Sequence, residues 1–352
     1  MFTGLKIIEL ASVMAGPAAG SFFSELGADV VKIENPKTGG DITRQWKLPS
    51  ENPASPASAY FASVNWRKLH LFLDLQDPEC QQQVRDMIKT ADVMICNWKK
   101  GDAEKFHLDH ATVAAINPGI VYANINGFGD EEDRFAFDVV LQAETGWMFM
   151  NGTPSSPPVK LPVAIIDLFA AHQLKEGILT ALIHKMRTGK GSRVSVSLYD
   201  AAIAALANQA SNYITAGHVP QRIGSLHPNI APYGEILTCS EGRQVVLAIG
   251  SDRQFRALCA ILGDPDLASD PRYNNNKNRV MNRNTLIGML QARVQSLPCS
   301  SFLQLCKQQH VPVGAIRDLQ QVFAEPSAQE LILSDEIGKR VKSAIFRVES
   351  LV

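Results

Sequence analysis

The first third of the chain alternates short apolar segments with segments whose apolar positions recur every three or four residues. The apolar segments span residues 5–10, 29–33, 92–96 and 120–125, and the helical ones span residues 18–26, 78–90 and 111–116. Strands and helices that alternate through short connections predict a parallel sheet covered by helices. These strands have few alternating polar positions, which indicates a sheet buried on both faces.

A long helix is predicted after Asp167, because its apolar positions keep helical spacing and Gly189 offers a stop. A cluster of histidine, proline, glycine and asparagine between residues 217 and 230 is typical of a linker or binding loop. The remaining candidate strands are 193–198 and 244–249, and the remaining candidate helices are 200–210, 253–262, 282–296 and 300–309.

These patterns predict two α/β domains. We expect a large domain with its linker over residues 1–224, a smaller α/β domain over 225–320, and a segment 321–352 that returns to the large domain.

Composition excludes several classes of protein. The 352 residues are 45% hydrophobic and 20% charged, with a net charge of −1, which gives no electrostatic case for nucleic acid or an acidic membrane surface. No apolar run approaches the roughly 20 residues that span a bilayer, and the N-terminal segment lacks the basic leader of a signal peptide. Six dispersed cysteines are typical of reduced thiols, and the eight histidines form no metal-binding motif. We expect a cytoplasmic protein without a metal.

The N-terminal segment has the outline of a dinucleotide-binding fold. A strand leads through Gly16 and Gly20 into a helix, and a second strand ends at Glu34, where such folds bind ribose hydroxyls. The loop contains no G-x-G-x-x-G, however, so no glycine pair lets the backbone approach a pyrophosphate. The spacing therefore favours a helix-entry turn at Gly16 and Pro17 over a site for NAD or FAD.

Asp167 is an acidic residue within the apolar run V-A-I-I-D-L-F-A-A, at the predicted start of the long helix. Apolar surroundings raise the pKa of a carboxylate, whereas the N-terminus of a helix lowers it. A carboxylate that is ionised but poorly hydrated is a usable nucleophile. Taken alone, the position favours an N-cap aspartate, which needs no catalytic role.

Other candidates have ordinary structural explanations. His172 follows Asp167 by about one helical turn, but a histidine of the core or surface explains it as well. A basic group surrounds a T-G-K-G turn and suggests a phosphate site, although a solvated turn has the same composition; its members are Lys185, Lys190, Arg187 and Arg193.

Read together, the segments resemble family III CoA-transferases of the CaiB/BaiF type. The resemblance rests on G-L-K-I-I-E-L-A-S-V-M-A-G-P, L-G-A-D-V-V-K-I-E-N-P, N-W-R-K, A-D-V-M-I-C-N-W, I-N-P-G-I-V-Y-A-N-I-N-G-F-G, F-D-V-V-L-Q-A-E-T-G, R-T-G-K-G-S-R-V-S-V-S-L-Y-D-A-A, H-P-N-I-A-P-Y-G and G-S-D-R-Q-F. These motifs follow one another in order over about nine tenths of the chain, and the ordered set is far more specific than any one of them.

The resemblance implies a fold and a mechanism. It implies a Rossmann-like large domain that binds CoA, a smaller α/β domain, and an interlocked, ring-like homodimer. It places the catalytic aspartate of the family on Asp167. That carboxylate would attack an acyl-CoA to form a mixed anhydride, become an aspartyl-CoA thioester, and pass CoA to an acceptor acid. CoA and its acyl thioesters would be substrates, with no tightly bound cofactor.

The resemblance also implies CoA contacts. It assigns Val13, Met14 and Ala15 to a backbone turn near the thiol, and it assigns Lys68, Asn97, Trp98, Lys105 and Phe106 to the adenine and phosphates. Lys105 replaces an arginine usual in the family, which loses its bidentate fork on phosphate. Asn35 also replaces an arginine, for which Lys37 or Arg44 would compensate. Gly224 lies where relatives place a glycine-rich loop over the active site, here poorer in glycine.

Two related functions stay open. The α-methylacyl-CoA racemases share this fold and use a histidine in a G-H-D motif as a second acid–base group. Here the motif reads F-A-F-D, so Phe137 stands at the histidine position ahead of Asp138, and phenylalanine cannot transfer a proton. A CoA-binding homologue without catalysis is the other alternative, suggested by Asn35, by Lys105 and by a chain end at Val352 ahead of the C-terminal segment many relatives possess. No residue selects the acids, for which oxalate and succinate are examples by analogy.

Overall fold

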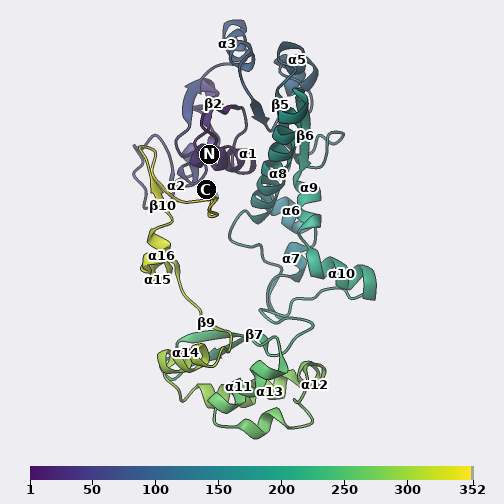
Figure 1. Cartoon of the computed structure of the whole chain (residues 1–352), viewed down its shortest axis with the longest axis vertical. Helices are drawn as coiled ribbons and strands as arrows, with labels where there is room; N and C mark the ends of the chain where they lie inside the picture. Colours follow the sequence, from purple (N-terminus) through teal and green to yellow (C-terminus); the bar gives the residue numbers. More distant parts are fainter. Residues whose placement is uncertain (350–352) are drawn as a thin grey trace. The chain divides into compact units, whose positions relative to one another are not determined.

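A computed structural model gives the structure of the chain and describes residues 1–349 (Figure 1). The chain forms two compact units. The first comprises residues 1–148, 160–220 and the segment from Gln329 onward, and the second comprises residues 149–159 and 221–328. The second unit thus includes residues 149–159, which lie between two segments of the first unit in the sequence. No sequence pattern indicated this.

The first unit is built on a six-stranded parallel sheet with the order β3-β2-β1-β4-β5-β6. Its strands are β1 (Lys6–Glu9), β2 (Asp29–Glu34), β3 (Leu69–Phe72), β4 (Val93–Cys96), β5 (Val121–Asn126) and β6 (Ser192–Ser197). This is the strand order of a Rossmann fold, whose topology reverses between β1 and β4. The predicted α/β fold with a parallel sheet is therefore confirmed, and β3 is a strand that the sequence patterns missed.

Helices cover both faces of this sheet. The helices from α1 to α10 are α1 (Ala15–Glu25), α2 (Ala59–Ala62), α3 (Pro78–Ile88), α4 (Asp102–Lys105), α5 (His110–Ile116), α6 (Asp138–Glu144), α7 (Trp147–Met150), α8 (Ile165–Thr188), α9 (Leu198–Ala204) and α10 (Ala207–Ala216), with two 3₁₀ turns, η1 (Pro36–Thr38) and η2 (Ile42–Gln45). One core cluster lies under α1 and α8, and another under α3 and α5. The sheet is thus buried on both faces, as its apolar strands predicted.

Local signals explain several helix ends. Asp77 caps α3 with its side chain, and Pro78 occupies the first position, where its missing N–H is harmless. Gly189 ends α8 in the left-handed conformation, as predicted. The single helix expected at residues 200–210 is wrong. It is broken between α9 and α10, where Ala207 has a φ of 47°, a conformation that an alanine-rich pattern does not signal.

The second unit contains a small antiparallel sheet of three strands in the order β7-β8-β9. Its elements are β7 (Tyr233–Thr238), β8 (Gln244–Ala248), α11 (Asp252–Ile261), η3 (Pro265–Ala268), α12 (Asn276–Met281), α13 (Arg283–Val294), α14 (Cys299–Gln308), β9 (Val313–Ala315), α15 (Leu319–Phe323) and α16 (Pro326–Gln329). A separate apolar core lies within this unit. The predicted strand at 244–249 and the three predicted helices after it are confirmed within one or two residues.

The segment from Gln329 onward packs within the first unit through a two-stranded hairpin, β10 (Ile332–Ser334) and β11 (Lys339–Val341). Glu25 at the end of α1 fixes this segment, since its carboxylate binds Arg340 and accepts hydrogen bonds from the backbone of Ser343 and Ala344. Asp335 likewise accepts a hydrogen bond from the N–H of Arg67.

Candidate active site

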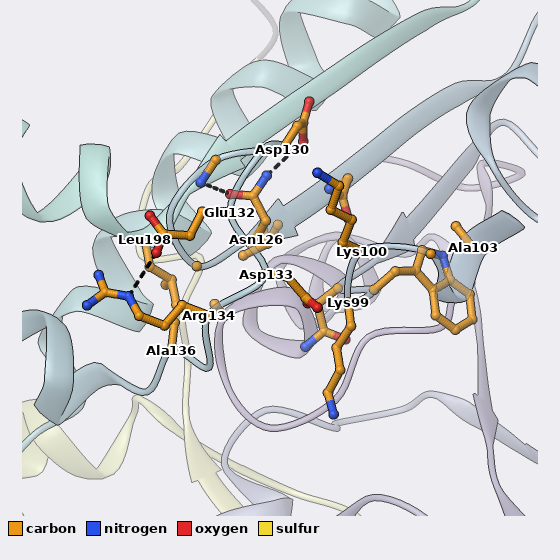
Figure 2. A pocket seen from close by; sticks show the side chains of 18 of the residues that line it. Lys99, Lys100, Ala103, Asn126, Asp130, Glu132, Asp133, Arg134, Ala136 and Leu198 are labelled. Carbon is orange, nitrogen blue, oxygen red and sulfur yellow. Dashed lines mark hydrogen bonds and ion pairs between the residues drawn. The ribbon is translucent and has the colours of Figure 1, made fainter. Parts of the chain in front are cut away.

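A cavity of about 770 Å³ opens at the carboxyl ends of β1, β4 and β5 in the first unit. Its walls come from residues 12–15 after β1, residues 97–101 after β4, and residues 124–137 at and beyond the end of β5 (Figure 2). Open α/β sheets bind ligands where the strand order reverses, which here is the gap between β1 and β4. The cavity therefore occupies the position that this topology favours for a ligand.

Most of the site residues expected from the sequence meet at this cavity. Its lining includes Val13, Met14, Ala15, Asn97, Trp98 and Asp167. Trp98 also lines a second cavity of about 380 Å³, together with Phe106, whose ring lies 5.7 Å from the Trp98 ring. Two residues expected to contact CoA do not reach the site: Lys68 and Lys105 line neither of these cavities.

The turn after β1 is held by side chains from loops elsewhere in the first unit. The amide of Asn97 pairs with both backbone groups of Ser12, at 3.1 Å and 3.0 Å. The N–H of Val13 points to both oxygens of Asp41, at 3.3 Å and 3.1 Å. Val13 has a φ of 72°, a left-handed conformation that is strained for a β-branched residue. The turn is therefore fixed in a shape that its own sequence disfavours.

Lys68 lies in a buried charge network beneath this turn rather than in the cavity. Its ammonium group lies 2.9 Å and 2.8 Å from the two oxygens of Glu9 and donates to the carbonyl of Pro17 at 2.9 Å. Burial lowers the pKa of Lys68 to about 7, although Glu9 opposes this shift. Gly20 makes room for the pair, because a Cβ atom there would lie 1.9 Å from Glu9 Oε2. A direct phosphate contact by Lys68 does not fit this burial.

Lys32 continues the network. Its ammonium group lies 3.1 Å from Glu9 and 3.1 Å from Asp41, and it donates to the carbonyl of Ala11 at 2.6 Å. Burial acts to lower the pKa of Lys32, but the two carboxylates outweigh burial and raise it. In register, Glu9 on β1 stands opposite Lys32 on β2. The ends of neighbouring parallel strands thus bring these charges together.

Asp167 lies in the first turn of α8 and lines the cavity with only 8% of its surface exposed. Among residues 1–349, its carboxylate makes no hydrogen bond or ion pair. Burial raises the pKa of Asp167 to about 7, and the like charge of Asp138 adds to the increase. The N-cap alternative for Asp167 is wrong. Ala164 is the N-cap residue, and Asp138 accepts the hydrogen bond from the N–H of Ile166 at 2.8 Å.

Asp138 thus has two effects on Asp167. Its Oδ1 atom satisfies the start of α8, while its charge opposes ionisation of Asp167. Gln142 fixes the other oxygen of Asp138 at 2.5 Å and accepts from the N–H of Leu161 at 2.8 Å. The carboxylate that caps the helix is therefore held rigidly beside the cavity.

We expect Asp138→Asn to lower the pKa of Asp167, because the amide keeps an oxygen for Ile166 but carries no charge. Burial remains, so the pKa should stay above its ordinary value. The acidic limb of kcat/KM against pH should move to lower pH. The amide also faces the donor of Gln142, which costs about 1 kcal/mol of stability. An unmoved limb would show that the Asp138 charge does not reach Asp167.

The larger cavity carries both signs of charge (Figure 2). Arg193 pairs with Asp130 at 2.7 Å, and Arg134 binds Glu144 through two contacts of 2.9 Å. Lys99 differs, since its ammonium group lies over the Phe135 ring at 4.1 Å. Of the lysines and arginines that line this cavity, only Lys99 makes no ion pair within residues 1–349. Sequence analysis missed Lys99, although its place two residues after the expected Asn97 was a usable signal.

Glu34, the acidic residue at the end of β2, already has partners within the protein. Glu34 binds the guanidinium of Arg44 at 2.6 Å and the ring of His70 at 2.7 Å. Burial opposes ionisation of Glu34, but these hydrogen bonds hold its pKa well below the ordinary value. Glu34 is therefore not free for ribose hydroxyls, and Arg44 is not free to replace the missing arginine at Asn35. Lys37 is exposed and pairs with Asp74 at 2.7 Å.

The remaining candidates lie outside this site or carry no acid–base group. Phe137 lines the cavity and is half exposed, so no imidazole stands there. His172 has an exposed side chain on α8 and does not line the cavity. Partial desolvation, followed by the charge of Lys175, lowers the pKa of His172. In the T-G-K-G region, Lys185 pairs with Asp92 at 2.8 Å. Gly224 belongs to the second unit, where its N–H binds the carbonyl of Gly152 at 2.8 Å.

Two kinds of feature are absent from residues 1–349. No cluster of three or more histidine, cysteine, aspartate or glutamate side chains has the arrangement of a metal site. No helix in that range combines the length and apolar character needed to cross a bilayer.

Comparison with known proteins identifies the family. The model of CoA-transferase family III matches residues 2–349. A succinate–glutarate CoA-transferase of Agrobacterium fabrum is 38% identical over 93% of this chain and 82% of its own length. The human succinyl-CoA:glutarate CoA-transferase is 33% identical over 92% of this chain and 73% of its own. A crystal structure of a CaiB/BaiF family protein from Brucella suis superposes with a TM-score of 0.85 at 36% identity, covering 99% of this chain and 93% of that one. The chain therefore belongs to CoA-transferase family III.

Proposed function

We propose that this protein transfers CoA from an acyl-CoA to a free carboxylic acid, with Asp167 as the covalent carrier. The observation that carries the proposal is a buried carboxylate without a partner at the wall of a ligand-sized cavity. Structural carboxylates in this protein are paired, as Glu9 and Glu34 are. Keeping Asp167 unpaired costs stability, and a nucleophile benefits from the weak solvation that results.

The proposed reaction begins when the Asp167 carboxylate attacks the carbonyl carbon of the donor thioester. The C–S bond breaks, which leaves a mixed anhydride on Asp167 and a CoA thiolate. The thiolate then attacks the aspartyl carbonyl, so the donor acid leaves as a carboxylate and Asp167 becomes a CoA thioester. The acceptor carboxylate attacks this thioester, which forms a second mixed anhydride on Asp167 and releases the thiolate. The thiolate then attacks the acceptor carbonyl of that anhydride, so the acceptor acyl-CoA forms and the Asp167 carboxylate is regenerated. Activated acyl bonds of similar energy are exchanged throughout, so the chemistry needs neither ATP nor a net proton transfer.

The start of α1 suits the negative charge that develops in each of these steps. Met14 and Ala15 line the cavity with Asp167, and Met14 provides no side-chain cap for the helix. The first N–H groups of a helix have no acceptor within it, and they carry the positive end of its dipole. Donors fixed in this way stabilise oxyanions without reorganisation during the reaction.

CoA binding is proposed along the two cavities that Trp98 joins. Val13, Met14 and Ala15 would surround the thiol end, while Trp98 and Phe106 offer aromatic faces to the adenine. Lys68 is proposed to support the turn from below instead of binding phosphate. Lys99 is the cavity cation left for a phosphate, whereas Lys105 lies 5.3 Å from the Phe106 ring outside both linings.

A comparison of two neutral variants tests this change of assignment. Lys99→Gln should raise KM for the acyl-CoA about 3- to 30-fold with little change in kcat, because it removes a ground-state phosphate contact. Lys105→Gln should have the smaller effect. Initial rates over a range of acyl-CoA concentrations measure both constants. A larger rise in KM for Lys105→Gln would return the assignment to the residue that the sequence favoured.

We propose that two copies of the chain assemble as an interlocked homodimer. An interlocked homodimer would cover the exposed apolar side chains of α10, a helix with no buried residue in the single chain, where Ile214 is 78% exposed. Light scattering should then give about twice the mass of one chain. The large domain would bind CoA. We further propose that the protein works in the cytoplasm.

For the acids, we propose short dicarboxylates, because the relatives named above are called transferases of succinate and glutarate. The test is to incubate the protein with succinyl-CoA or acetyl-CoA and a panel containing glutarate, succinate, oxalate and monocarboxylic acids. New acyl-CoA should form with the dicarboxylates. Exchange of the α-proton of 2-methylacyl-CoA without transfer would identify a racemase instead, and CoA binding with neither reaction would identify a non-catalytic homologue.

A further inference from the structure

The buried charge network ends on the one strained residue of the cavity wall. From Glu9 the contacts run through Lys32 to Asp41, and Asp41 receives the N–H of Val13. The side chains of Lys32 and Asp41 are each 1% exposed. Such a buried pair adds little net stability compared with apolar residues of the same size. Its position at the cavity suggests a role in shaping the turn.

Three backbone contacts made by the network fall on the turn that precedes or opens α1, and Asp41 also accepts a hydrogen bond from the N–H of Thr43 at the start of η2. Lys32 binds the carbonyl of Ala11, Asp41 binds the N–H of Val13, and Lys68 binds the carbonyl of Pro17. The residues between these anchors are the ones whose N–H groups lie at the helix start. The network thus holds both ends of the segment and leaves its centre for a ligand.

We propose that Asp41 is a positioning residue, which holds Val13 in the left-handed conformation and thereby aims the N–H groups that follow it into the cavity. Without the bond to Asp41, a β-branched residue leaves the left-handed region, since its Cβ atom crowds the backbone there. The start of α1 would then shift relative to Asp167. This positioning role rests on the proposed CoA transfer, whose kcat provides the kinetic measurement.

The proposal makes a specific prediction about glycine at position 13. Glycine adopts positive φ without strain, so it does not need Asp41 to hold it. Asp41→Ala should reduce kcat about 10- to 100-fold, the effect of misplacing a catalytic group by about 1 Å. Adding Val13→Gly should recover most of this loss, measured against Val13→Gly alone as the reference. A general loss of stability at Asp41 would not be repaired in this way.

A second measurement does not depend on catalysis. The N–H of Ser12 is bound to Asn97, next to the strained residue. Hydrogen–deuterium exchange of the peptide that covers residues 11–17 should be faster in Asp41→Ala, and it should slow again at Ser12 when Val13→Gly is added. Glu25→Gln is the matched control. It removes a buried carboxylate that binds Arg340 in the C-terminal segment, and it should leave exchange in this peptide unchanged.

The outcomes separate the two proposals. If wild type transfers no CoA to any acid, the proposed function fails, while the exchange measurement still decides the role of Asp41. If Asp41→Ala matches wild type in kcat and exchange, or if a folded double variant is as impaired as Asp41→Ala, the positioning role is overturned. Should the alanine variant not fold, Asp41→Asn replaces it. Its amide has a single oxygen where the carboxylate uses two for the N–H groups of Val13 and Thr43, so we expect a smaller loss of kcat that Val13→Gly again recovers.

Discussion

Asp167→Asn should lower kcat for CoA transfer by at least about a thousandfold, because the amide has the shape of the carboxylate but cannot form the anhydride or the thioester. The cavity and the start of α8 should be undisturbed, since the Asp167 carboxylate makes no hydrogen bond within residues 1–349. The variant should therefore still bind acyl-CoA with nearly unchanged affinity. Steady-state rates with succinyl-CoA and glutarate give kcat, and calorimetry gives the dissociation constant.

Mass spectrometry distinguishes a covalent carrier from a carboxylate that acts only by its charge. Wild type mixed with acyl-CoA and quenched in acid should carry the mass of CoA on the peptide that contains Asp167, and Asp167→Asn should not. Asp138→Asn, which keeps the nucleophile, serves as the control and should still form the adduct. Transfer by Asp167→Asn within tenfold of wild type, or an adduct on another residue, would contradict the mechanism.

The same substitution should stabilise the folded protein. Burial raises the pKa of Asp167 from 3.8 to about 7, so the folded state binds a proton more tightly than the unfolded state does. Between these values the stability of wild type falls as pH rises, and above about pH 7 the whole penalty is present. Asn carries no charge to bury. We expect Asp167→Asn to exceed wild type by about 1 to 4 kcal/mol at pH 8, and by less at pH 5.

Denaturant unfolding at both pH values and at one protein concentration measures this difference. Glu25→Gln provides a control in which loss of a carboxylate should have the opposite effect on stability, because Glu25 is buried but paired with Arg340. Its loss should destabilise the protein. If Asp167→Asn is no more stable than wild type at pH 8, the Asp167 carboxylate is not the strained group that the geometry indicates.

The sequence predicted the strands of the sheet correctly where burial alone determines which positions are apolar. Central strands β1, β4 and β5 are apolar on both faces, and their short runs were found within two residues. β3 escaped because it is an edge strand whose four residues are all partly exposed, so neither an apolar run nor a clean alternation marks it. Edge strands have one unpaired side and need less apolar sequence.

The site was harder to predict, because its key contacts join residues far apart in the chain. The surroundings of Asp167 suggested an N-cap, and only Asp138, 28 residues before Ile166, makes that unnecessary. Lys68 seemed suited to bind phosphate until the fold paired it with Glu9, 59 residues away. Local patterns contain no information on such pairings. The ordered motifs pointed to Asp167, which lines the cavity, but they could not show which nearby lysines reach it.

Gly20, which lies above the Glu9–Lys68 pair, constrains how this protein can evolve. A methyl group at position 20 would overlap Glu9 Oε2, and it would come within 3.3 Å of the Lys68 ammonium group. Removing Glu9 alone would make that space but leave the buried charge of Lys68 without its carboxylate. Glu9 and Lys68 are therefore each acceptable only in the presence of the other and of Gly20, and substitutions at the three positions should be strongly non-additive. The glycine is required here for space, and a change at any one position becomes tolerable only with compensating changes at the others.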